Sequence, residues 1–303
     1  MLVRFVHQNI HRFVGRHPRP AAVPQAPVRS TAVPDVTANG VRLSYQIDGP
    51  VDGEPVVLVC GTGQPAVTWQ MALGPTLVAA GYRVVSFDNR GVEPSEAPPP
   101  PYSVADMAAD AAGLIEALQL GPCWVAGLSL GALITQELAL ARPDLVRGAV
   151  MMGTLGRSNV MLRAWAEAYL EVARAGTVLP ARLQAVATAM QVISPAHQLD
   201  DAFIGPWLEL MEAAPPWEGP GQEGQYAADL AYDDRLGALS GVAVPALVIG
   251  FEHDLITPTA LGREVAEAIP GATYREVPGC GHLGPIESSE AVLPALLDFF
   301  GAG

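Results

Sequence analysis

The feature that most constrains the fold is the segment 126–132, which reads AGLSLGA and places Ser129 between two glycines. Residues 123–126 before it form a short apolar run that is typical of a buried strand, and apolar residues recur at helical spacing over 130–141 after it. A G-x-S-x-G sequence between a strand and a helix is characteristic of a nucleophile elbow, the sharp turn that exposes a reactive serine. Glycines are needed because such a turn leaves no room for Cβ atoms two positions to either side.

Ser129 is therefore the candidate nucleophile. The amide of Leu130 lies at the predicted N-terminus of the following helix, where an N–H group can stabilise a developing oxyanion. A glycine-rich turn can also hold an ordinary serine. The assignment therefore depends on whether the chain supplies a base and an acid, because a serine hydroxyl is a poor nucleophile without them.

Two later segments offer these groups. The predicted strand over 244–250 is followed by Glu252, His253 and Asp254, and the predicted strand over 273–277 is followed by Gly281-His282. The imidazole of His282 would take the serine proton, and a carboxylate would fix its tautomer. Glu252 is an alternative to Asp254 as the acid, and each group could instead be an ordinary polar residue of a loop. The order serine, aspartate, histidine is nevertheless the one expected for a strand-end triad.

Strand-like and helix-like patterns alternate over most of the chain. This alternation predicts an α/β fold with a mostly parallel sheet covered on both faces. The predicted strands are 41–47, 55–60, 82–87, 123–126, 149–153, 244–250 and 273–277, and the predicted helices are 68–80, 103–118, 130–141, 258–269 and 286–300. Ser103 is the expected N-cap of its helix.

The alternation stops over 155–240, where only helical periodicity is present. We expect a helical cap, because an insertion between parallel strands would lie over their carboxyl ends, where ligands bind. Trp165, Trp207 and Trp217 are candidate substrate-binding residues in this segment, although large apolar residues also form a cap's own core. Glycine and proline gather over 215–221 and provide a candidate lid hinge. We expect the cap to select the substrate and to contribute little to the chemistry.

The domain organisation follows from these patterns. Residues 35–154 and 241–303 form the expected core and 155–240 the cap. Residues 1–34 contain five arginines, three histidines and several prolines but no acidic residue, and we expect them to be a disordered extension.

Composition excludes several classes of partner. The net charge of −14 argues against nucleic acid, because the chain lacks a basic surface that could neutralise phosphates. No uninterrupted apolar run reaches membrane-spanning length, so we expect no stable membrane insertion. Cys60, Cys123 and Cys280 are scattered and lack metal-ligand spacing, which favours a reduced, cytoplasmic chain without a metal. The expected partner is a small-molecule substrate, and the oligomeric state stays open.

The chain resembles capped members of the α/β-hydrolase fold family, in the esterase, enol-lactonase and cofactor-free haloperoxidase-like branch. The resemblance covers about 36–300 and is carried by 127–131, 88–91, 250–258 and Gly281-His282. It implies an eight-stranded sheet with the cap inserted after strand six, and no cofactor. It also implies that Ser129 is the nucleophile, His282 the base and acid, and Asp254 its orienting partner.

The same resemblance places the oxyanion hole at the backbone amides of Leu130 and Thr62. Two departures affect that side of the site. Many relatives have His-Gly where this chain has Cys60-Gly61, and Glu93 replaces a usual glycine in the loop after residue 90. A residue other than glycine disfavours left-handed backbone angles, so this loop is expected to run differently.

The sequence thus predicts a serine hydrolase that cleaves a carboxylic ester, thioester or lactone of an apolar small molecule through an acyl-enzyme. Carbon–carbon bond hydrolysis and acyl transfer to another acceptor are alternatives on the same three residues. A non-catalytic binding protein that keeps the fold is a further alternative. Binding alone does not require the triad, and fold does not identify the substrate.

Overall fold

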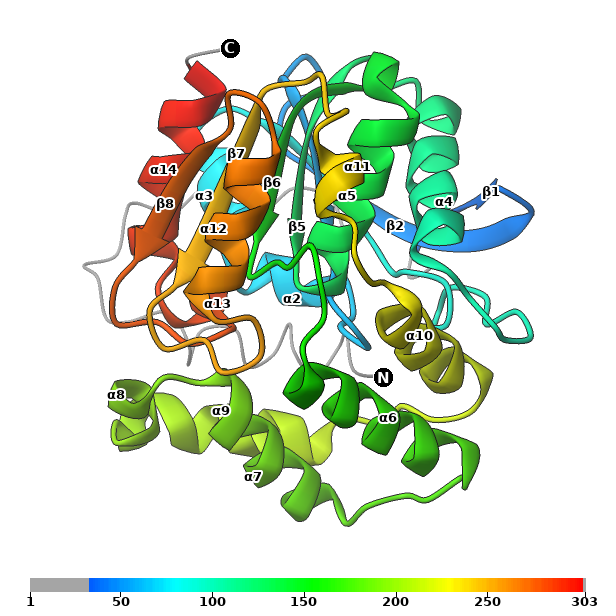
Figure 1. Ribbon diagram of the computed structural model, residues 1–303, viewed down its shortest axis with the longest axis vertical. Coiled ribbons are helices and arrows are strands. Elements are labelled where there is room, and N and C mark those ends of the chain that lie inside the picture. The colour runs from blue at the N-terminus through cyan, green and yellow to red at the C-terminus, as the bar shows by residue number, and fades with distance from the viewer. Residues whose placement is uncertain (1–32, 302–303) are drawn as a thin grey trace, which may run out of the picture.

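An eight-stranded sheet forms the centre of the molecule in the computed structural model, which describes residues 33–301 (Figure 1). Its strand order is β1-β2-β4-β3-β5-β6-β7-β8, and all neighbours are parallel except the antiparallel pairs β1–β2 and β2–β4. The predicted sheet, mostly parallel and covered on both faces, is confirmed. The strands are β1 Asp35–Ala38, β2 Val41–Asp48, β3 Pro55–Val59, β4 Arg83–Phe87, β5 Cys123–Leu128, β6 Val146–Met152, β7 Ala246–Phe251 and β8 Thr273–Val277.

Helices cover both faces of the sheet because its central strands are apolar on both sides. Val57 and Leu58 are adjacent in β3, are both fully buried, and belong to separate hydrophobic cores on opposite faces. One core includes α4, α5 and α12, and the other includes α3 and α14. These helices and the short ones beside them are α2 Val67–Gln70, α3 Leu73–Ala79, α4 Val104–Ala117, α5 Leu130–Ala141, η1 Pro143–Leu145, α12 Thr259–Ala268, α13 Gly284–Glu287 and α14 Ser289–Gly301.

Two predicted helices are each divided in the structure. The helix expected over 68–80 is broken at Ala72, whose φ of −120° and ψ of −114° are not helical. The last helix is broken at Ser288, with φ −154°, so that α13 and α14 are separate. Helical periodicity continues across both breaks, which is why the sequence pattern did not reveal them. Ser103 caps α4 as predicted, and its Oγ accepts a hydrogen bond from the Asp106 amide at 3.1 Å.

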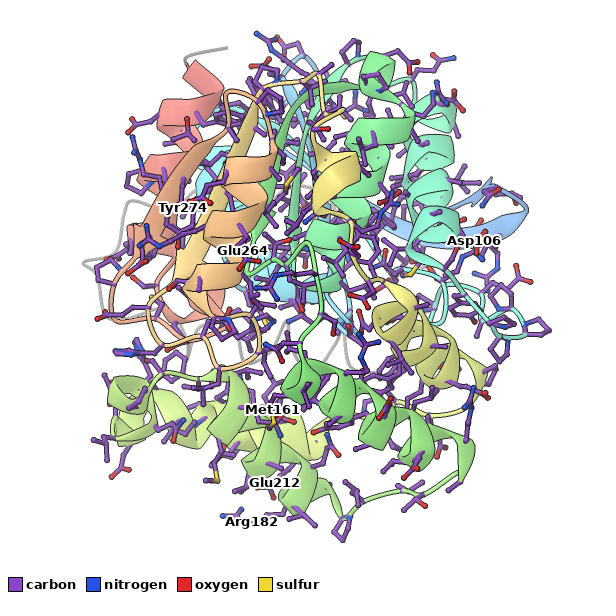
Figure 2. All side chains as sticks on the ribbon, in the orientation of Figure 1. Asp106, Met161, Arg182, Glu212, Glu264 and Tyr274 are labelled. Carbon is purple, nitrogen blue, oxygen red and sulfur yellow. The ribbon has the colours of Figure 1, made fainter. Side chains whose placement is uncertain are left out.

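The segment between β6 and β7 is helical, and its residues 160–231 lie beneath the sheet in Figure 1, at the carboxyl ends of the strands, whereas the short helix Leu236–Leu239 packs against α12. Helix α6 packs against α10, and α7 packs against α9. Arg182 of α7 and Glu212 of α9 form an ion pair at 2.6 Å at the outer edge of this segment (Figure 2). The helices are α6 Val160–Arg174, α7 Ala181–Val192, α8 Pro195–Gln198, α9 Asp201–Ala213, α10 Pro220–Ala231 and α11 Leu236–Leu239.

The predicted limits of the cap at 155 and 240 stay a prediction. The extension expected over 1–34 lies almost entirely outside the described residues. No helix within residues 33–301 is long and apolar enough to cross a membrane.

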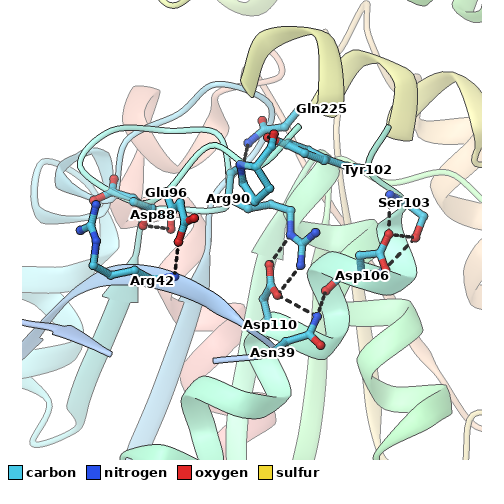
Figure 3. Close-up of polar contacts among 12 residues, drawn as sticks. Asn39, Arg42, Asp88, Arg90, Glu96, Tyr102, Ser103, Asp106, Asp110 and Gln225 are labelled. Atoms are coloured by element: carbon cyan, nitrogen blue, oxygen red, sulfur yellow. Dashed lines mark hydrogen bonds and ion pairs between the residues drawn. The ribbon is translucent and has the colours of Figure 1, made fainter. Parts of the chain in front are cut away.

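A buried ion pair fixes the loop after β4. Arg90 donates from Nε and Nη2 to the two carboxylate oxygens of Asp110 on α4, each at 2.6 Å (Figure 3). Asn39 Nδ2 donates to the same carboxylate at 3.0 Å, and the guanidinium lies over the Tyr102 ring at 5.5 Å. The two charges are satisfied by each other and by neutral partners, as a buried pair requires. The start of the loop after β4 is therefore held against α4, and the same carboxylate also holds the turn between β1 and β2.

We expect Asp110→Ala to destabilise the protein by about 3–5 kcal/mol, because it leaves the Arg90 charge buried without a partner. Asp35→Ala is the control, since it breaks the exposed Arg42–Asp35 pair and should cost under about 1 kcal/mol. Urea unfolding of both variants measures the difference. Equal costs would show that the Arg90 pair does not stabilise the fold more than a surface pair.

Candidate active site

Ser129 occupies a strained turn between β5 and α5. Its φ of 57° and ψ of −124° are rare for a residue with a side chain, and its amide donates to Met152 O at 3.0 Å. A Cβ on Gly127 would lie 2.0 Å from Gly131 O, and one on Gly131 would lie 2.2 Å from Val59 O. Both glycines are therefore obligatory, and the strand–turn–helix geometry of the predicted elbow is present.

Asp254 and His282 meet at the ends of β7 and β8. His282 Nδ1 lies 2.8 Å from Asp254 Oδ2, and the two side chains are almost completely buried. Asp254 Oδ1 also accepts hydrogen bonds from the amides of Ile256 and Thr257 at 2.8 and 2.7 Å. The Thr257 hydroxyl donates to Asp254 Oδ2 at 2.8 Å. These three donors hold the carboxylate in the orientation that receives the imidazole.

Glu252, the alternative acid, faces a different partner. Its Oε2 accepts a hydrogen bond from the Gly279 amide at 2.8 Å, so it holds the turn that leads toward His282. The backbone amide of His253 donates to Cys280 O at 2.8 Å, and this hydrogen bond holds the same turn. Of the two carboxylates, the structure places Asp254 against the imidazole.

The loop after β3 lies beside Ser129. A Cβ on Gly61 would be 3.2 Å from Ser129 Cβ, so the two backbones are in close contact. The Gly61 amide donates to Gln64 Oε1, and the Gly63 amide donates to Gln225 Oε1 of α10, at 2.9 and 2.8 Å. The flanking amides are thus engaged, and Thr62 between them lines the cavity that Ser129 faces.

The two departures from the family pattern have local explanations. Asn89 Nδ2 donates to Cys60 O at 2.8 Å, so an amide side chain from the neighbouring loop braces the backbone at this position. In the loop after Arg90, Gly91 has a φ of +86°, whereas Glu93 is not among the residues of positive φ. The backbone therefore does not require a glycine at position 93.

A cavity of about 1360 Å³ lies between the sheet and the inserted helices. Ser129, His282, Thr62 and Leu130 line it, so the structure brings these predicted residues to one cavity. The three candidate tryptophans also line it, and each has contacts within the protein.

Trp165 Nε1 donates to Gln191 Oε1 at 2.9 Å, and Trp207 is only 4% exposed. Trp217 Nε1 donates to Gly91 O at 2.8 Å. All three therefore contribute to the packing of the inserted helices as well as to the cavity wall. For each tryptophan, the position in the cavity wall is compatible both with substrate binding and with a structural role.

Two carboxyl groups, those of buried Asp88 and half-buried Asp229, lie close to these loops. Burial raises the pKa of Asp229 to about 7, against the opposing effects of the hydrogen bond from Thr62 and of nearby His282. Burial also raises the pKa of Asp88 to about 7, although the Ala66 amide donates to its Oδ1 at 2.7 Å.

Three side chains that are not among the predicted site residues contact the loops of the site: Gln225, Asp229 and Glu287. Glu287 accepts hydrogen bonds from the amides of Gly281 and Ser194 at 2.8 and 2.9 Å, and so joins the histidine loop to the end of α7. Gln225 and Asp229 are polar residues four positions apart on a predicted helix. That spacing indicates a shared face but not which loop the face contacts.

The family model described as the alpha/beta hydrolase fold matches residues 54–289. The chain belongs to the α/β-hydrolase fold family. Residues 54–289 include all the strands from β3 to β8, the elbow, Asp254 and His282.

Individual relatives of this hydrolase have several named activities. It is 40% identical over 261 residues to the "Putative non-heme bromoperoxidase BpoC" of Mycobacterium tuberculosis, covering 86% of this chain and 98% of that protein. The crystal structure of that protein superposes with a TM-score of 0.81. The enol-lactonase from Burkholderia xenovorans LB400 has a TM-score of 0.77 at 27% identity, covering 88% and 100% of the two chains. Rhodomycin D methylesterase DnrP of Streptomyces peucetius is 28% identical, covering 86% and 95%.

We expect the raised pKa of Asp88 to make stability depend on pH. Between about pH 4 and 7 the native carboxyl keeps a proton that the unfolded chain, with a pKa near 3.9, has released. Stability should therefore fall as pH rises through this window, by at most about 1.4 kcal/mol per pH unit.

Asp88→Asn removes this titration and keeps an oxygen that can accept from the Ala66 amide. Urea unfolding of both proteins from pH 4 to 8 should show wild-type stability falling relative to the variant. Parallel pH curves would contradict the buried-carboxyl explanation.

Proposed function

We propose that this hydrolase cleaves a carboxylic ester, thioester or lactone through an acyl-enzyme, with Ser129, His282 and Asp254 as its triad. One observation carries the proposal. The elbow serine lines the same cavity as an imidazole whose Nδ1 is 2.8 Å from a buried carboxylate. Because Nδ1 is directed at Asp254, Nε2 is the nitrogen left to exchange a proton with the serine.

The first half of the reaction forms the acyl-enzyme. Ser129 Oγ attacks the carbonyl carbon while its proton passes to His282 Nε2, and the carbonyl π electrons move onto the oxygen. The amides of Leu130 and Thr62 donate to that oxyanion. When the tetrahedral intermediate collapses, the carbonyl re-forms, the bond to the leaving group breaks, and the imidazolium returns its proton to the departing oxygen or sulfur.

Water completes the reaction by the same route. His282 Nε2 takes a proton from water as the hydroxyl oxygen attacks the acyl carbon. The second tetrahedral intermediate then releases the carboxylic acid, and the proton returns to Ser129 Oγ. Throughout both halves Asp254 stays ionised and stabilises the imidazolium.

The cavity wall supports an apolar and uncharged acyl group. Leu133, Leu162, Met211 and Ile286 line it together with the three tryptophans, and each buried methylene of a substrate contributes about 0.8 kcal/mol. Among the described lining residues, the acidic and basic side chains are carboxyl groups and His282, and no arginine is present. Such a wall disfavours an anionic acyl chain. The names of the related methylesterase and enol-lactonase fit ester and lactone substrates.

Replacement of Ser129 by alanine tests the nucleophile. We expect Ser129→Ala to abolish labelling by a fluorophosphonate and to reduce kcat for an activated ester by a factor of about 10⁶. Ser158→Ala is the matched control, since this serine lies in a loop before α6 without the elbow geometry. Full labelling of Ser129→Ala, at the wild-type rate, would refute the assignment.

Replacement of each carboxylate tests the acid. Asp254→Asn should lower kcat by about 10⁴ with the fold intact, because an amide at this position favours the wrong imidazole tautomer. Glu252→Gln should have a much smaller effect on kcat. The Glu252 carboxylate accepts a hydrogen bond from the Gly279 amide, whereas Asp254 is the carboxylate that faces His282. A larger loss of kcat in Glu252→Gln would mean that the acid is misassigned.

A further inference from the structure

Helix α10 contacts the loop after β3 through two side chains that lie one turn apart. Gln225 and Asp229 occupy positions i and i+4, so they share one face of the helix. Gln225 Oε1 accepts a hydrogen bond from the Gly63 amide at 2.8 Å, and Asp229 Oδ2 accepts one from the Thr62 hydroxyl at 2.8 Å. A single helix face thus holds two consecutive residues of the loop that carries the Thr62 amide.

Gln225 also ties this contact to the rigid part of the fold. Its Nε2 donates to Arg90 O at 2.8 Å, and Arg90 is itself fixed by Asp110 on α4 (Figure 3). The Gln225 side chain is completely buried. The oxygen and the nitrogen of the Gln225 amide are thus both hydrogen-bonded. This one side chain therefore fixes α10 relative to the loop after β3 and the loop after β4.

The surrounding packing leaves little freedom at this junction. A Cβ on Gly63 would lie 2.5 Å from the Trp217 ring, and one on Gly221 would lie 2.0 Å from Gly91 O. Trp217 and α10 are therefore in close contact with the loops after β3 and β4. A shift of α10 would displace the backbone of residues 61–63.

On the basis of the proposed function, we propose that α10 positions the oxyanion loop, with Gln225 and Asp229 as its positioning residues. An oxyanion donor acts only when it lies about 2.7–3.1 Å from the oxygen of the transition state. Neither side chain needs to touch the substrate. Both act by keeping the Thr62 amide at that distance, next to the close contact of Gly61 with Ser129.

This assignment divides the inserted helices by function. Side chains that only line the cavity contact the acyl group in ground state and transition state alike, so their loss changes KM. Loss of the α10 contacts would instead move a donor that matters in the transition state, so it would change kcat. For α10 the proposal differs from the expectation that the whole segment 155–240 contributes little to the chemistry, and the experiment below distinguishes the two.

A double-mutant cycle tests the proposal. We would measure kcat and KM for p-nitrophenyl butyrate, and the Ki of butylboronic acid, for Asp229→Leu, Thr62→Val, the double variant and Asp229→Asn. Asp229→Leu should lower kcat about ten- to a hundredfold with KM nearly unchanged, and raise the boronate Ki in parallel. The double variant should lose no more than the worse single variant, because both changes break one contact. Asp229→Asn should keep most of the activity, since its amide oxygen still accepts from Thr62.

Gln225→Leu provides an independent second variant, with the same expected loss of kcat. Glu223→Gln is the control, because it lies on α10 but pairs with Arg174, away from the loop. It should leave kcat, KM and the boronate Ki unchanged. Thermal unfolding of every variant separates loss of kcat in folded protein from loss of the fold.

The outcomes separate this inference from the proposed function. Additive losses in the cycle, or wild-type kcat in both Asp229→Leu and Gln225→Leu, would overturn the role of α10 alone. A wild-type protein that neither reacts with a fluorophosphonate nor hydrolyses the ester would overturn the proposed function and this inference together.

Discussion

The close approach of α5 to β3 is the constraint on which the site depends. Strand β5 must turn into α5 directly above the end of β3, and Gly131 there packs against the backbone of Val59 and Cys60. The turn stores its strain at Ser129, whose backbone angles are tolerated only because the paired strands and α5 fix both sides. The same contact brings the loop after β3 next to the serine. Ser129 and the loop that carries Thr62 are thus positioned by the same packing contact.

The fold was predictable because the core strands carry strong local signals. Buried runs such as β3 and β5 consist almost entirely of apolar residues, and glycine turns follow both of them. Strand β1 was missed because Asp35–Ala38 has only four residues, two polar and two apolar, and is stabilised by pairing with β2 rather than by its own pattern. Breaks within helices were missed for a similar reason, since periodicity does not record a single non-helical residue such as Ala72.

Some residues of the candidate site have a local sequence signal, and others depend on contacts between distant parts of the chain. Ser129 and His282 were identified by the turns that precede them, and these turns are local. The choice between Asp254 and Glu252 was not local, because both carboxylates follow the same strand two residues apart. It depends on which one faces the His282 imidazole, and the amides of Ile256 and Thr257 orient the Asp254 carboxylate for that contact. Gln225 and Asp229 depend on contacts across more than a hundred residues, which no spacing within α10 encodes.

The inserted helices are attached to the loops around Ser129 and His282 at two separate points. At one, Gln225, Asp229 and Trp217 hold the loops after β3 and β4. At the other, Glu287 joins Gly281 to Ser194, and the Leu283 amide donates to Val192 O at 3.1 Å. The candidate hinge 215–221 is itself part of the first attachment. A rigid movement of the whole insertion would therefore break contacts to both the loop after β3 and the loop that carries His282. We therefore expect substrate access to depend on movement of the segments between the two attachments, because such movement leaves Thr62 and His282 in place.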